Sequence, residues 1–82
     1  MLKPILNRRG LYFTTYYIYD TEAHKYVGIV EDHDTAVRQR YYVGWKFPQN
    51  TFYPNTNQRG RTKSFYTFVD AMKYTEVDFN EE

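Results

Sequence analysis

Apolar and polar side chains alternate along much of this chain, a spacing that indicates β-strands more often than helices. The run from Leu11 to Tyr19 is the most β-prone part, because it combines aromatic with β-branched residues. Since both of its faces are apolar, we expect an inner strand. A second strand is predicted from Tyr26 to Val30, in which Gly28 suggests a bulge or a group that packs over the backbone. Turns are predicted at 20–25 and 31–34.

The segment from Thr35 to Lys46 fits two structures. A helical turn could begin after Asp34, because residues from Ala36 to Tyr41 match helical spacing over one turn. Alternation fits the whole segment better and predicts a third strand. One face of that strand would hold Val37, Gln39, Tyr41, Val43 and Trp45, and the other would hold Arg38, Arg40, Tyr42 and Lys46. The prediction is therefore an apolar inner face and a basic face toward solvent.

The stretch from Arg61 to Tyr74 predicts a strand that leads into a helix. Polar and aromatic residues alternate from Arg61 to Tyr66, as on a half-buried strand. Thr67 and Asp70 have the spacing of a capping box, in which each side chain accepts a hydrogen bond from a backbone N–H of the first turn. The helix should lie on the sheet through an apolar stripe made of Phe68, Ala71, Met72 and Thr75.

The pattern Phe65-x-Thr67-x-x-x-Ala71 resembles a junction at which a three-stranded antiparallel sheet leads into a packed helix. Such junctions occur in a plant family of DNA-binding domains and in the hybrid-binding domain of RNase H enzymes. The resemblance implies a topology only, and no base-reading residue is carried over from it. Taken together, the patterns predict an α+β fold, with an antiparallel three- or four-stranded sheet and one short C-terminal helix packed on one face.

Three segments lack a sustained period. Residues 1–10 are predicted to be a basic arm, residues 47–60 a long loop rich in Pro and Asn, and residues 76–82 an acidic tail. Within the loop, we expect Phe52-Tyr53-Pro54 to anchor in the core rather than form an exposed recognition tip. One domain should span 1–82, because a chain of 82 residues has room for one core. The N-terminal apolar run is too short for a secretory signal or a membrane span.

Aromatic residues dominate the apolar content, with ten Tyr, six Phe and one Trp. They make up 21% of the chain, against 41% for all hydrophobic residues, so we expect a core built from rings. Tyrosine joins apolar area to a hydroxyl group, which also suits a contact surface. The chain has no cysteine, which excludes disulfides and thiol nucleophiles and is compatible with the cytoplasmic location that we expect.

No catalytic motif is present: the chain lacks an activated serine, a phosphate-cradling glycine loop and a metal-spaced histidine pair. Asp32-His33-Asp34 could bind a divalent ion, but neighbouring side chains point in different directions, so we expect a solvated turn. His24 should likewise be exposed in a turn. We therefore expect no enzyme, no metal and no cofactor, and a protein that acts by binding.

Charge is segregated along the chain although its net value is +1. No acidic residue occurs between Thr35 and Val69, and the acids gather at 20–34 and 70–82. If the third strand and the strand from Arg61 are neighbours, their outward side chains form one basic and aromatic patch. Phosphates would meet its cations and unpaired bases would stack on its rings. The predicted nucleic-acid-binding residues are Arg38, Arg40, Tyr42, Lys46, Arg59, Arg61 and Lys63.

The first functional expectation is thus a nucleic-acid-binding module without membrane contact. The second is a small phage-type accessory protein that docks on and modulates a larger host protein complex through a Tyr-rich surface, since Tyr, Trp and Arg dominate interface hot spots. Nucleic-acid binding should weaken steeply with salt and with Arg38→Ala or Arg40→Ala, whereas an aromatic interface should fail on Tyr-to-Ala changes. A basic face kept for solubility, and a self-associating structural piece, are further alternatives.

Overall fold

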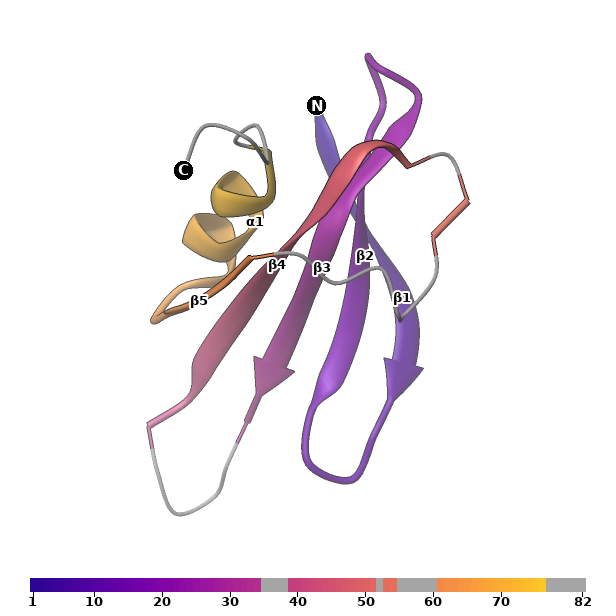
Figure 1. The fold of residues 1–82 in the computed structure, drawn as a ribbon. Helices are drawn as coiled ribbons and strands as arrows, with labels where there is room; N and C mark the ends of the chain where they lie inside the picture. The colour runs from indigo at the N-terminus through magenta and orange to yellow at the C-terminus, as the bar shows by residue number, and fades with distance from the viewer. Residues whose placement is uncertain (35–38, 52, 55–60, 77–82) are drawn as a thin grey trace.

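Five strands and one helix make up the part of the chain that this computed structural model describes, residues 1–34, 39–51, 53–54 and 61–76. They are β1 (Leu2–Arg9), β2 (Thr14–Asp20), β3 (Lys25–His33), β4 (Tyr41–Thr51), β5 (Thr62–Phe65) and α1 (Phe68–Glu76). The sheet is antiparallel and its strand order, β1-β2-β3-β4-β5, follows the chain (Figure 1). The α+β class and the C-terminal helix are confirmed, but the sheet has five strands instead of three or four.

The N-terminal segment is an edge strand, so the prediction of an arm is wrong. β1 pairs with β2 from Leu2 to Arg9, with a bulge between Leu6 and Arg8. Pro4 lacks a backbone N–H and is tolerated because β1 lies at the edge of the sheet. Leu2 packs against the core from this strand.

β2 and β3 are confirmed as strands, and β2 is an inner strand as predicted. The turn between them spans Thr21 to His24, where the Asp20 carboxylate accepts hydrogen bonds from the backbone N–H groups of Glu22 and Ala23. His24 is exposed in that turn, as expected. The predicted turn at 31–34 is wrong, because β3 continues to His33. Partners on β4 account for this: the register pairs residues 31–33 with residues 41–43.

β4 runs from Tyr41 to Thr51, so the strand prediction is confirmed for Tyr41 to Lys46. The first five residues of the predicted loop, 47–51, belong to this strand, so the loop prediction is wrong for them. Residues 35–38 and most of the remaining loop lie outside the described residues. Tyr53 is 90% exposed, so the prediction of an anchor in the core is wrong for this residue, while Phe52 is not described.

The predicted facing of β4 is wrong. Tyr42 lies edge-on to Phe68 of α1, and the Lys46 ammonium lies over the Tyr74 ring, so the side predicted to be solvated faces the helix. Gly44 explains why α1 packs on this side of β4, because a Cβ there would lie 3.0 Å from the Ala71 carbonyl oxygen. A helix can approach this closely only over a residue without a side chain.

β5 and α1 follow the sequence prediction closely. The Thr67 hydroxyl oxygen accepts a hydrogen bond from the Asp70 N–H at 3.2 Å, which caps the helix. The predicted stripe faces the sheet: Ala71 and Thr75 are buried, and Phe68 and Met72 are partly buried against the core. Tyr74 is also buried and was not part of the predicted stripe.

The core lies between α1 and the middle of the sheet, with Ile18, Val30 and Ala71 at its centre. α1 covers β3, β4 and β5 on one face, while β1 lies at the far edge (Figure 1). Rings close the end of the core nearest the start of α1, where Phe68 meets Tyr16 and Tyr42 edge-on. Within the described ranges, no helix has the length and apolar character needed to cross a membrane.

Candidate binding surface

Two of the predicted nucleic-acid-binding residues lie beneath α1. Lys46 is fully buried, with its Nζ 4.2 Å from the centroid of the Tyr74 ring. Tyr42 is half-buried, with its ring 5.6 Å from that of Phe68. The prediction that Lys46 and Tyr42 face solvent is therefore wrong, because α1 packs on this side of β4.

Arg40 is exposed, but its charge is already paired. Its Nε and a terminal nitrogen donate to the two carboxylate oxygens of Asp32 at 3.0 and 2.6 Å. This hydrogen bonding, together with the negative charge of Asp32, raises the pKa of Arg40 above its ordinary value. A phosphate that approached Arg40 would compete with a carboxylate that already binds it at two points.

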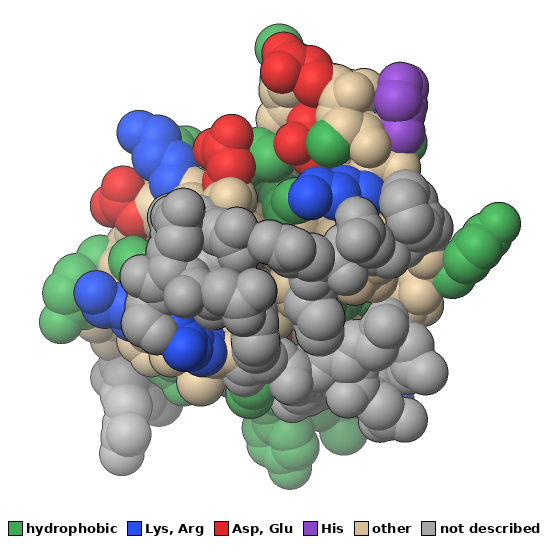
Figure 2. Space-filling view, turned by 45° about the horizontal axis from the view of Figure 1, so that its top comes forward, with side chains coloured by type: hydrophobic (Ala, Val, Ile, Leu, Met, Phe, Trp, Pro, Cys, Tyr) green, Lys and Arg blue, Asp and Glu red, His purple; other side chains and the backbone are tan. Residues whose placement is uncertain are grey.

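Arg61 and Lys63 are the other described members of the predicted set, and both are exposed. Lys63 lies in β5, with its ammonium 5.8 Å from the centroid of the Phe65 ring. Arg38 and Arg59 lie outside the described residues. On the face shown in Figure 2, Lys and Arg side chains appear at separate places, and some lie near acidic groups. The described members of the set thus do not form one exposed basic face.

The connection between β1 and β2 exposes apolar side chains instead. Leu11 is 97% exposed and Tyr12 is 81% exposed. The turn that carries them is closed by a hydrogen bond from the Gly10 N–H to the Phe13 carbonyl oxygen at 3.0 Å. A Cβ on Gly10 would lie 2.7 Å from that oxygen, so the turn needs a glycine at this position.

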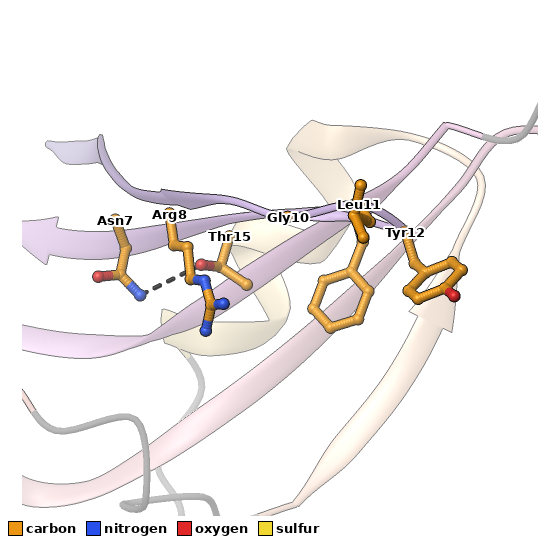
Figure 3. Close-up of a pocket in the computed structure, with 7 residues that line it drawn as sticks. Asn7, Arg8, Gly10, Leu11, Tyr12 and Thr15 are labelled. Atoms are coloured by element: carbon orange, nitrogen blue, oxygen red, sulfur yellow. Dashed lines mark hydrogen bonds between the residues drawn. The ribbon is translucent and has the colours of Figure 1, made fainter.

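A β-bulge in β1 brings the Arg8 side chain close to these exposed residues. The register passes from Leu6 opposite Tyr16 to Arg8 opposite Thr15, so Asn7 is the extra residue of β1. The Asn7 side-chain nitrogen donates to the Thr15 hydroxyl at 3.1 Å, which holds the bulge. Figure 3 shows the Arg8 and Tyr12 side chains on the same side of the hairpin.

These residues line a pocket of about 410 Å³ that opens to solvent. We call the pocket and its lining residues the hairpin surface: Asn7, Arg8, Gly10, Leu11, Tyr12, Phe13 and Thr15. Arg8 makes no ion pair with any residue that the structure describes. The hairpin surface therefore offers an available guanidinium beside exposed apolar and aromatic groups.

A stack of three rings supports one wall of this pocket. The Phe13 ring lies 4.4 Å from the His33 ring at an interplanar angle of 22°, and the Tyr41 ring lies 4.6 Å from His33 on its other side at 13°. The stack crosses β3 and β4, and Tyr41 at its far end lines a second pocket of about 390 Å³. Phe13 is thus held by rings from two neighbouring segments.

A buried carboxylate holds the middle ring of the stack. Glu31 is 5% exposed, and its Oε1 lies 2.9 Å from the Nε2 of His33. Its other oxygen accepts a hydrogen bond from the indole N–H of Trp45. Hydrogen bonds at a partly buried position restrict the imidazole ring, and stacking passes that restriction to Phe13.

Sequence reasoning placed Leu11 to Phe13 inside a strand and did not predict the hairpin surface. A usable signal was present, since Arg8-Arg9-Gly10 precedes three apolar residues and no acid occurs before Asp20. As for metal binding, no group of three or more potential ligands occurs among the residues that could be searched, those of the described ranges. No family model, curated protein or solved structure matches this chain.

Proposed function

We propose that this chain is a non-catalytic module that binds another protein through the hairpin surface. The exposure of Leu11 and Tyr12 carries this proposal, because two large side chains at the tip of a hairpin contribute little to the fold that displays them. Full burial of each against a partner would be worth about 1.5–3 kcal/mol. Tyr and Arg are the residue types that most often dominate binding energy at interfaces.

The support beneath the hairpin surface favours the same function. Phe13 is stacked on His33, and His33 is hydrogen-bonded to the buried Glu31. A surface that is already ordered loses less conformational freedom on binding, so more of the contact energy becomes affinity. We place this activity in the cytoplasm and take the partner to be a larger protein complex on which this small chain docks.

Nucleic-acid binding is the second candidate, and the exposed cations Arg61 and Lys63 favour it. It ranks lower because Lys46 and Tyr42 lie beneath α1 and Arg40 is paired with Asp32. Titrations of labelled oligonucleotides at rising salt test it. Lys73, which is exposed in the last turn of α1, is the control cation. A steep loss of affinity with salt, together with loss on Lys63→Ala but not on Lys73→Ala, would make nucleic acid the leading function.

A photo-crosslinking residue at position 12 tests protein binding directly. Placed at Tyr12, p-benzoylphenylalanine should form a crosslink to one main protein in the cell that produces this chain. The same group at Tyr53, which is 90% exposed but lies outside the hairpin surface, is the matched control. Equal crosslinking patterns from the two positions would contradict the proposal, because they would show non-specific contact of exposed rings.

The crosslinked protein is then purified and its affinity for variants is measured. Tyr12→Ala should weaken binding by about 30-fold, the effect of losing a hot-spot side chain worth about 2 kcal/mol. Tyr53→Ala should change the affinity by less than about twofold. Because Tyr12 and Tyr53 are both exposed, neither change should unfold the protein.

A further inference from the structure

We infer that the pocket of the hairpin surface binds a carboxylate of the partner together with a neighbouring aromatic side chain, with Arg8 as the carboxylate-binding residue. This inference rests on the proposed function and specifies the chemistry of the protein segment that is recognised. It depends on three features of the described residues: the charge of the hairpin, the position of Arg8 and the walls of the pocket.

The hairpin carries positive charge that the fold leaves uncompensated. Residues 1–19 contain Lys3, Arg8 and Arg9 and no acidic residue. None of these three side chains forms an ion pair with a residue that the structure describes. An acidic group of a partner would therefore find complementary charge here.

The acids of the neighbouring strand are already engaged. The Asp32 carboxylate accepts two hydrogen bonds from Arg40, and the Glu31 carboxylate contacts His33 and Trp45. The charge of Asp34 acts on Arg40 as well. These contacts leave the positive charge of the hairpin available to an external anion.

The bulge at Asn7 decides which arginine enters the pocket. Arg8 stands opposite Thr15 and lines the pocket, whereas Arg9 stands opposite Thr14 and does not line it. Side chains of successive strand residues point to opposite faces, so the two arginines form a natural matched pair for experiments. A guanidinium presents two parallel N–H donors, an arrangement that fits the two oxygens of a carboxylate.

The walls of the pocket indicate the group beside the carboxylate. Leu11, Tyr12 and Phe13 supply apolar and aromatic surface, and the volume of about 410 Å³ leaves room for an aromatic side chain. A nucleic acid would be a poorer occupant, because its successive phosphates need several cations and Arg8 is the only cation among the described residues that line the pocket. The observations thus favour a peptide segment over a polyanion.

Small probes test this chemistry without the natural partner. The full-length protein, labelled with ¹⁵N, is titrated with N-acetylphenylalanine, which carries a carboxylate beside a benzyl group, and with its carboxamide, which lacks the charge. N-acetyl-aspartyl-phenylalaninamide carries the carboxylate on a side chain and distinguishes an internal acidic residue from a chain terminus. The amide signals of Gly10, Leu11 and Phe13 should shift and saturate with at least one of the two carboxylate probes.

The variants assign the carboxylate contact to Arg8. Arg8→Gln should weaken the binding of the carboxylate probe about five- to tenfold and leave the affinity for the carboxamide probe unchanged, because only a charge-assisted hydrogen bond is lost. Arg9→Gln, which keeps the same net charge as Arg8→Gln, should have less than about a twofold effect. Equal weakening by the two variants would overturn the inference, since it would show a general effect of charge.

Equal affinity for the carboxylate and the carboxamide probes would also overturn the inference, as would shifts that occur only outside the hairpin. Tighter binding of a mononucleotide than of all three peptide probes would overturn the inference as well, and would indicate nucleic acid as the ligand. The proposed function fails separately. If Tyr12→Ala abolishes partner binding while Arg8→Gln leaves it intact, the hairpin still binds a protein and only the carboxylate chemistry is wrong.

Discussion

Gly28 and Gly44 lie beneath α1 where a Cβ would meet atoms of α1 and of neighbouring segments at 3.1 Å or less, so an added methyl group tests the packing directly. A Cβ at Gly28 would lie 2.0 Å from the Trp45 carbonyl oxygen and 2.8 Å from the Thr75 side chain. A Cβ at Gly44 would lie 3.0 Å from the Ala71 carbonyl oxygen and 3.1 Å from a ring carbon of Tyr74. Gly28→Ala should therefore destabilise the protein much more than Gly44→Ala.

The expected sizes follow from these distances. Overpacking of a core typically costs about 1–3 kcal/mol. Gly28→Ala should reach about 3 kcal/mol, because a Cβ there would lie only 2.0 Å from a backbone oxygen that cannot rotate away. Gly44→Ala should cost about 1 kcal/mol, since a shift of a few tenths of an ångström relieves it. In a domain of this size 1 kcal/mol corresponds to roughly 4–8 °C, so the melting temperature should fall by roughly 12–24 °C and 4–8 °C respectively.

Urea unfolding followed by the fluorescence of Trp45, the single tryptophan, measures both changes. Val69→Ala is the control, because Val69 lies in α1 but is 54% exposed, and its free energy of unfolding should change by about 0.5 kcal/mol or less. If Gly28→Ala were as stable as the unchanged protein, or less affected than Gly44→Ala, the described spacing between α1, β3 and β4 would be refuted.

Three other predictions concern the cap, the ion pair and the ring stack. Thr67→Ala should lower the free energy of unfolding by about 1 kcal/mol, because it removes the cap of α1. Thr67→Ser is the control, because serine keeps the hydroxyl group that accepts the hydrogen bond. The hydrogen bonds to Asp32 raise the pKa of Arg40, so this pairing stabilises the fold at every pH below the ordinary pKa of an arginine, which lies far above the neutral range. The difference in urea midpoint between Arg40→Gln and the unchanged protein should therefore stay constant from about pH 7 to pH 10, and a drift would contradict the pairing with Asp32. His33→Ala removes both ring contacts of the stack, each worth about 0.5–1.5 kcal/mol. Loss of the stack should speed hydrogen exchange at the Gly10 amide, which donates to the Phe13 carbonyl oxygen, whereas unchanged exchange would show that the stack does not stabilise the hairpin.

Local chemistry was sufficient to predict β5, the start of α1 and the existence of β2 and β3, but not the start of β2 or the end of β3. The spacing of Thr67 and Asp70 indicates a helix start by itself, and the hydrogen bond to the Thr67 hydroxyl confirms the cap. β1 could not be predicted in the same way, since a segment with Pro4 and three cations becomes a strand only because β2 is available to pair with it. Pairing across a sheet is a tertiary property that intrinsic strand preference reflects only weakly.

The facing of β4 shows a second limit of sequence reasoning. Alternation identified two sides correctly but assigned the wrong one to the core. Lysine and tyrosine carry apolar surface below a polar end, so Lys46 and Tyr42 can pack under a helix as well as face water. Gly44 was the deciding residue, because the side of the strand that lacks a side chain there admits α1.

The candidate site was harder to predict than the fold. Asn7 is an ordinary polar residue in the sequence, yet as the extra residue of a bulge it brings Arg8 to the face that carries Thr15. A change of one residue in register reverses the face of every side chain that follows, so no periodic pattern could assign Arg8 to the pocket. The charge pattern of residues 1–19 was visible, but its position beside Tyr12 was not.

The affinity of the purified crosslinked partner for Tyr12→Ala, compared with its affinity for Tyr53→Ala, tests the claim that the hairpin surface binds protein. Both side chains are exposed tyrosines, and only Tyr12 lies at the pocket. We predict that Tyr12→Ala weakens binding about 30-fold while Tyr53→Ala changes it less than about twofold. Equal affinities for the two variants would contradict the account.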